Sequence, residues 1–170
     1  GKLRWAKTFG GTSSDYVYDL AVDPAGNVAI TGYFRYSINF GGSTLSVKGS
    51  SSYSDIYVAS FDSSGKHRWS NGYGGTSYDY GQGIATDAAG NVYITGYFQG
   101  SASFGGSTIS SKGSYDVYLA SFDKNGKHRW SKGFGNTSSD YGYKLATDGS
   151  GNVYLTGYFY NSINFGGSTI

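Results

Sequence analysis

The 170-residue sequence contains no cysteine and no methionine, and it has few charged residues. Without cysteine the chain forms no disulfide framework and performs no thiol chemistry, and this absence leaves the redox compartment open. Charged residues make up 14% of the chain and the formal net charge is +2. A field this weak does not favour nucleic acid or an anionic membrane as a partner. No apolar run reaches the length of a membrane span and no signal-peptide pattern is present, so we expect no membrane insertion.

Glycine and tyrosine dominate the composition instead, with 29 and 18 residues. Tyrosine favours the pleated, half-buried surface of a β-sheet, and glycine serves tight turns and close approaches of the backbone. The apolar residues show no helical period anywhere in the chain. The sequence therefore predicts an all-β fold.

Three near-copies of one segment make up the chain. The motif Gly-Lys-x-Arg-Trp begins at positions 1, 65 and 126, so the repeat period is 61 to 64 residues. The motifs Gly-Asn-Val and Thr-Gly-Tyr-Phe recur in the same register. Repeats of this kind bury their apolar faces against neighbouring copies. We predict a single repeat domain over residues 1–170, made of repeats 1–64, 65–125 and 126–170, the last of which is incomplete.

One repeat contains the pattern of four strands. In the second copy the expected strands are residues 79–87, 92–98 and 116–123, and a fourth that begins at His128. Asp-x-x-Gly turns separate the first strand from the second and the third from the fourth, because aspartate opens turns and glycine tolerates a positive φ. Residues 1–10 match the fourth strand, so we expect the chain to open with a strand.

The strands do not alternate cleanly between apolar and polar residues. In the second strand Val92, Ile94 and Phe98 fall on one face, while Tyr93 and Tyr97 fall on the other. Each four-stranded antiparallel sheet is then covered on both sides, as in the blades of a β-propeller. A two-sheet sandwich is the alternative, but it leaves one face of each sheet polar and fits the pattern less well.

The order of these motifs also resembles a known family. The series Trp, Phe-Gly-Gly, Asp-Tyr, Asp-x-x-Gly-Asn-Val-Tyr-x-Thr-Gly, Asn-Phe-Gly-Gly and Asp-x-Tyr-x-Ala-x-Phe-Asp is similar to the bacterial β-propeller repeat family called SBBP. The resemblance implies a propeller of four-stranded blades. It also implies large, secreted or surface-attached proteins, and it supplies no family catalytic residues to transfer.

The strand count does not complete three blades. One opening strand, two full blades and a closing pair give eleven strands where three blades need twelve, and the third strand of the split blade is missing. Closed propellers have about four to eight blades. An unpaired strand edge recruits another chain. Three solutions remain open: several chains form one ring, a strand of another molecule completes the edge, or the chain is part of a longer repetitive polymer.

The polar residues show no catalytic constellation. His67 and His128 occupy a repeat position that holds Leu3 in the first copy, which indicates packing or a surface site. The repeated aspartates are explained by hydrogen bonds to their own turns, and no segment shows the close alternation of carboxylates that calcium loops have. We predict no catalytic, cofactor-binding or metal-binding residues, no cofactor and no enzymatic activity.

Aromatic residues in register offer one candidate binding surface. Trp5, Trp69 and Trp130 share one repeat position, and exposed rings of this kind stack on sugars. The alternative, which we favour, is that the rings fill the space between blades.

Our leading hypothesis is an extracellular or cell-surface structural protein. Its blades self-assemble with copies of the same chain, through exposed strand edges, into a repetitive array or fibre. The alternative is a lectin-like propeller module that binds glycans at the cell surface.

Overall fold

The computed structural model describes residues 1–148 and 150–170. These residues form β-strands joined by turns and loops, and none of them lies in a helix that could span a membrane. The all-β prediction is therefore confirmed. The strands are β1 (Tyr16–Val22), β2 (Val28–Phe34), β3 (Ser37–Ile38), β4 (Leu45–Ser46), β5 (Asp55–Phe61), β6 (His67–Tyr73), β7 (Asp79–Thr86), β8 (Val92–Phe98), β9 (Ser101–Ala102), β10 (Ile109–Ser110), β11 (Asp116–Phe122), β12 (His128–Phe134), β13 (Tyr141–Thr147) and β14 (Val153–Tyr158).

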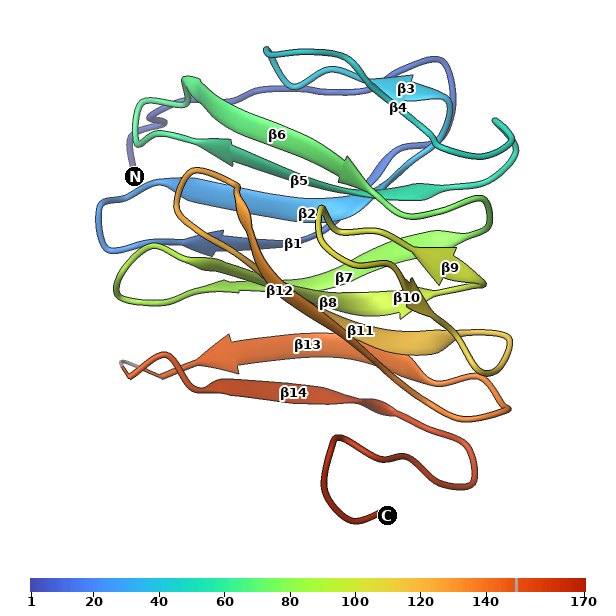
Figure 1. Cartoon of the computed structure of the whole chain (residues 1–170). Coiled ribbons are helices and arrows are strands. Elements are labelled where there is room, and N and C mark those ends of the chain that lie inside the picture. Colours follow the sequence, from blue (N-terminus) through green and yellow to red (C-terminus); the bar gives the residue numbers. More distant parts are fainter. Residues whose placement is uncertain (149) are drawn as a thin grey trace.

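The long strands form three antiparallel sheets that follow one another along the chain (Figure 1). The first sheet has the order β1-β2-β5-β6 and the second has the same order, β7-β8-β11-β12. The third sheet contains only β13 and β14. The four-stranded unit expected from each complete repeat is thus present twice, and the third unit holds two strands.

The first strands of the three sheets lie next to one another, with β7 between β1 and β13 (Figure 1). Small residues allow this close approach. A Cβ atom placed on Gly81 would lie 2.5 Å from Thr31 Oγ1 and 2.8 Å from the carbonyl oxygen of Gly32, in the first sheet. Real Cβ atoms do not approach backbone atoms this closely, so only glycine fits here without a shift of the chain. The glycine-rich first strand is therefore a packing requirement of the junction between sheets.

The inner strands of the complete sheets are buried on both faces, as the sequence pattern predicted, whereas β1 is largely exposed. Every residue of β5 is buried, and all but one residue of β8 are. The largest buried side chains are mostly aromatic rings, among them Phe34, Tyr57 and Phe104. By contrast β14, the second strand of the third sheet, has no fully buried residue. Burial of a strand thus depends on the strands and sheets that lie against it.

One expected strand is absent. Residues 1–10 have the sequence of a fourth strand, but the structure assigns them no strand. A fourth strand obtains its backbone hydrogen bonds from the third strand of its sheet, and β5 and β11 are already paired with β6 and β12. The segment instead packs through its side chains: the Phe9 ring lies 5.1 Å from the rings of both Phe40 and Phe61.

Two short hairpins were not expected from the sequence. The segment between the second and third strands forms β3–β4 in the first unit and β9–β10 in the second. Each hairpin buries two apolar residues, Ile38 and Phe40 in the first and Ala102 and Phe104 in the second. Strands of two residues carry too little alternation to be recognised from sequence.

Repeat-equivalent residues allow a matched test of this packing. Phe104 is fully buried against Tyr118, with ring centroids 4.7 Å apart, whereas its equivalent Phe165 is 46% exposed. We expect Phe104→Ala to lower the free energy of unfolding by about 3–5 kcal/mol because it leaves a cavity. Phe165→Ala should change it by less than about 1 kcal/mol. Urea unfolding followed by circular dichroism measures both, and equal losses would contradict the packing described here.

Candidate functional site

Two of the three repeated tryptophans pack against the following repeat. The Trp69 indole N–H donates to the carbonyl oxygen of Lys124 at 3.1 Å, in the turn between β11 and β12. A Cβ atom placed on Gly126 of this turn would lie 2.7 Å from the Trp69 ring, and one placed on Gly65 would lie 2.8 Å from Trp5. Each ring therefore covers the Asp-x-x-Gly turn of the next sheet, as the packing interpretation predicted.

Trp130 occupies the same repeat position at the far end of the row. Its ring is half-buried and lies 6.1 Å from Tyr93, and no following turn covers it within the residues described. Stacking of a sugar on Trp5, Trp69 or Trp130 stays a prediction, and Trp130 is the position with the most open ring environment.

The two histidines serve packing as well. The His67 ring lies edge-on to Phe61 at 6.1 Å, and its Nε2 is 3.1 Å from Ser70 Oγ. His128 repeats the arrangement with Phe122 and Ser131. Among residues 1–148 and 150–170, no group of three or more histidine, aspartate or glutamate side chains is placed to hold a metal ion.

The turn aspartates are saturated by their own turns. Asp23 Oδ1 accepts the amides of Ala25 and Asn27, and its Oδ2 accepts the Asn27 side chain. The same bonds recur at Asp87 and Asp148. These bonds lower the pKa of Asp148, the Asn152 side chain contributing most. The predicted structural role of these carboxylates is confirmed.

A second set of aspartates is buried between sheets, and their pairing was not predicted from the sequence. Asp55 begins β5 and Asp79 begins β7, and both side chains are almost completely buried. A Cβ atom placed on Gly74 would lie 2.5 Å from Asp79 Oδ2 and 2.9 Å from Asp55 Oδ1, so the two carboxyl groups converge on this glycine. The Gly75 amide donates to Asp79 at 2.7 Å, and the Lys48 amide donates to Asp55 at 3.0 Å.

Burial of this pair favours its neutral form. Burial raises the pKa of Asp79 to about 8, against the opposing effect of the Gly75 amide, and the nearby Asp55 charge raises it further. Burial also raises the pKa of Asp55 to about 6, although the Lys48 amide and ammonium group oppose this. At neutral pH the pair therefore retains a proton. The recurring motifs Asp-x-Tyr, which contains Asp55, and Asp-Tyr, which contains Asp79, were the available signal, but only the fold shows that the two aspartates meet.

A row of tyrosine rings crosses all three sheets. Within each sheet a first-strand tyrosine lies beside a second-strand tyrosine, and between sheets the rings meet edge-on at 5.0 Å and 4.8 Å. In chain order the row contains Tyr16, Tyr33, Tyr80, Tyr97, Tyr141 and Tyr158. The second-strand rings Tyr33 and Tyr97 thus fill the space between neighbouring sheets, whereas Tyr158 lies at the open end and is 40% exposed.

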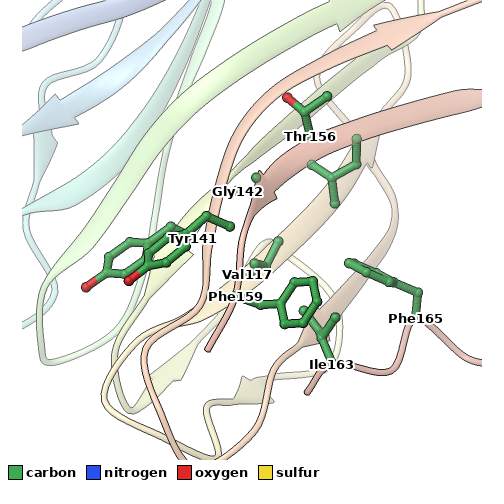
Figure 2. A pocket seen from close by; sticks show the side chains of 10 residues that line it. Val117, Tyr141, Gly142, Thr156, Phe159, Ile163 and Phe165 are labelled. Carbon is green, nitrogen blue, oxygen red and sulfur yellow. The ribbon is translucent and has the colours of Figure 1, made fainter. Parts of the chain in front are cut away.

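The third sheet leaves a hollow of about 260 Å³ beside β14. Figure 2 shows Phe159, Ile163 and Phe165 around it, with Val117 and Gly142 at the junction with the second sheet. The equivalents of the two phenylalanines in the second sheet, Phe98 and Phe104, are fully buried. Apolar walls and an unpaired strand edge make this the strongest candidate site for a polypeptide partner.

The other end of the row is also open, on the outer face of β1. Val17, Leu20 and Val22 are exposed there, and Tyr16 and Tyr18 of the same strand are exposed as well. Within the chain, each junction joins the face of one sheet to the first strand of the next. The outer face of β1 and the open face of the third sheet are the two surfaces of such a junction, and both are exposed.

Two segments of the chain, residues 69–97 and 129–158, match the family model of the SBBP beta-propeller repeat. The chain thus contains SBBP beta-propeller repeats at these two places, and the resemblance drawn from its motifs is confirmed there. Each match runs from the fourth strand of one sheet to the second strand of the next, β6 to β8 and β12 to β14. The sequence repeat therefore spans a junction between sheets.

The chain is also similar to a much longer viral protein, the "Uncharacterized WD repeat-containing protein L264" of Acanthamoeba polyphaga mimivirus. The two are 26% identical over 174 aligned residues. The alignment covers 87% of this chain and 12% of the relative, so the chain spans about one eighth of the relative's length.

The Asp55–Asp79 pair predicts a pH-dependent stability. Because folding raises the pKa of Asp79 from its ordinary 3.8 to about 8, its contribution is fully present below pH 3.8 and is lost as pH rises through about 8. We expect Asp79→Asn, which is neutral throughout, to flatten the fall in unfolding free energy between these pH values. Urea unfolding at several pH values measures the slope.

The matched control is Asp15→Asn, at the equivalent position on the open β1 end. This variant keeps the Asp55–Asp79 pair and should retain the slope of the unsubstituted chain. An unchanged slope in Asp79→Asn would show that the buried pair does not control the pH dependence.

Proposed function

We propose that this chain is a non-enzymatic, extracellular structural protein whose sheets stack on sheets of other copies to build a repetitive array or fibre. The observation that carries the proposal is that the open ends present the two faces which the internal junctions bury. Stacking of the third sheet of one copy on the first sheet of the next would continue the row that each chain already forms. Such head-to-tail contacts use two different surfaces, so they produce rings where the rotation between copies closes and filaments where it does not.

On the third sheet, the face toward the next copy includes Ala146, Tyr154 and Thr156. The equivalent residues inside the chain are covered by the next sheet. Ala21, equivalent to Ala146, packs against the core between the first and second sheets, and Thr95, equivalent to Thr156, is fully buried. Tyr154 is 58% exposed, whereas its equivalent Tyr93 is 4% exposed. A docking sheet would remove this apolar area from water, at about 25 cal/mol for each Å².

On the first sheet, Leu20 shows the same contrast. It is 59% exposed, and its equivalent Ile84 is 4% exposed because it packs in the core between the first and second sheets. The exposed Val22 has a Thr86 equivalent whose hydroxyl donates to the carbonyl oxygen of Val22 at 3.1 Å, across the junction. The outer face of β1 is thus more apolar than the equivalent face of β7.

Val17 makes the junction between copies different from the internal junctions. The equivalent positions hold Gly81 and Gly142, and a Cβ atom on either would lie 2.5 Å from a threonine Oγ1 of the preceding sheet. A valine here requires a small outward shift of the docking sheet. Copies therefore join less tightly than the sheets within one chain.

The non-enzymatic part of the proposal is supported by the polar residues. The turn carboxylates accept hydrogen bonds from their own turns, the histidine rings pack on phenylalanine, and the Asp55–Asp79 pair is buried between sheets. These polar groups therefore have structural roles. The extracellular part rests on the resemblance to SBBP-repeat proteins.

Two substitutions, one at each end of the row of sheets, test head-to-tail stacking. Ala146→Arg places a charged side chain on the face of the third sheet, and Leu20→Arg places one on the outer face of β1. We expect the mass of the unsubstituted chain to rise with concentration in analytical ultracentrifugation, and each variant to keep the mass of one chain. Thr44→Arg, on an exposed loop away from both faces, is the matched control and should associate normally.

An equimolar mixture of Ala146→Arg and Leu20→Arg gives a sharper result. Each variant retains one intact end, so the mixture can form one junction and should stop at dimers. A chain that stays monomeric at every concentration, or a mixture that forms no dimer, would refute stacking between copies.

A further inference from the structure

The second strand of each complete sheet has a partner on both edges. β2 pairs with β1 and β5, and β8 pairs with β7 and β11, all antiparallel. β14 pairs with β13 alone among the described residues. Its free edge therefore presents unpaired backbone N–H and C=O groups, which readily accept another strand.

The missing neighbour has a defined sequence. β5 reads Asp-Ile-Tyr-Val-Ala-Ser-Phe and β11 reads Asp-Val-Tyr-Leu-Ala-Ser-Phe. In the second sheet Tyr118 lies opposite Gly96, and Ala120 lies opposite Ile94. The same register on β14 would place a tyrosine opposite Gly157 and an alanine opposite Leu155.

The hollow beside β14 is the place for that tyrosine. In the complete sheets the ring of Tyr57 or Tyr118 lies 4.7 Å from Phe40 or Phe104. A Cβ atom on Gly96 would lie 3.0 Å from Tyr118 Oη, so glycine makes room for the ring. Gly157 and Phe165, which are equivalent to Gly96 and Phe104, both line the hollow.

The Thr156 hydroxyl group on β14 also lacks the acceptor that its equivalents use in the complete sheets. Thr31 donates to the carbonyl oxygen of Tyr57 at 2.9 Å, and Thr95 donates to that of Tyr118 at 2.7 Å. Thr156, their equivalent, makes a 3.5 Å contact with the carbonyl oxygen of Lys144. An incoming tyrosine would supply the carbonyl group that the complete sheets use.

We propose that the β14 edge and its hollow form a binding site for an extended polypeptide segment with the pattern Asp-x-Tyr-x-Ala-x-Phe, which pairs antiparallel with β14 and inserts its tyrosine between Gly157 and Phe165. The site continues an interface that the chain forms twice, between β2 and β5 and between β8 and β11. Because β5 and β11 are already engaged in their own sheets, the segment comes from a strand outside residues 1–170. The site uses the edge of β14, whereas stacking uses a face of the third sheet, and it stands whether or not copies associate.

The test uses a fluorescein-labelled peptide with the sequence of residues 112–122, which includes β11 and its preceding turn. We expect saturable binding to the whole chain in fluorescence anisotropy. A peptide with alanine in place of the tyrosine that matches Tyr118 should bind at least about tenfold more weakly, because that ring is the buried anchor. Amide chemical shifts of residues 153–158 should change on binding.

Variants of the chain locate the site. Phe165→Ala removes one wall of the hollow and should weaken binding at least about tenfold, while Leu3→Ala, an exposed apolar residue elsewhere, should leave it unchanged. Circular dichroism of each variant establishes that it is folded. Absence of peptide binding, or binding that is insensitive to both the peptide tyrosine and Phe165, overturns the proposal. Peptide binding by a chain that sediments as a monomer supports this site and refutes only the stacking of copies.

Discussion

The structure depends on the burial of both faces of every sheet. A sheet that is apolar on two sides is stable in water only between two other layers, so each unit of this chain requires a neighbour before and after it. The chain meets this requirement for its second sheet and for one side of its first. The close fit of Gly81 against Thr31 and Gly32 shows how tightly the neighbours are held, since no side chain fits between them. Exposure of the outer face of β1 and of the third sheet is the direct consequence of the same constraint.

Because the units repeat, the same contacts occur at several equivalent positions. The tryptophan that covers the next turn, the histidine on its phenylalanine, the aspartate that caps its own turn and the edge-on tyrosines all occur at equivalent positions. Departures from repetition are therefore informative. Val17 replaces a glycine at the open β1 face, and Phe165 loses the cover that its buried equivalents have. Both departures lie where the row of sheets ends, which is where we place contacts with other polypeptides.

The buried Asp55–Asp79 pair adds an electrostatic cost to one junction. Two carboxyl groups in a desolvated space retain a proton, because burial disfavours the charged form of both and the Asp55 charge further disfavours ionisation of Asp79. The amides of Gly75 and Lys48 compensate part of this cost through hydrogen bonds. The junction between the first and second sheets is thus held by apolar packing and weakened by alkaline pH. In the second junction, burial raises the pKa of Asp116 in the same direction, with a contribution from Asp140.

The sequence by itself determined the all-β class, the repeat period, most of the long strands and the turn role of the aspartates, because these follow from local preferences and from periodicity. It also indicated that repeated tryptophan rings pack between units, as Trp5 and Trp69 do. The tertiary structure decided what depends on contacts between distant residues. It showed that residues 1–10 form no strand, since their fourth-strand pattern lacks a third strand to pair with. It brought Asp55 and Asp79 together from different sheets, and it opened the hollow at Phe165, because a hydrogen-bonded neighbour and a covering ring are properties of the assembled sheets rather than of any one segment.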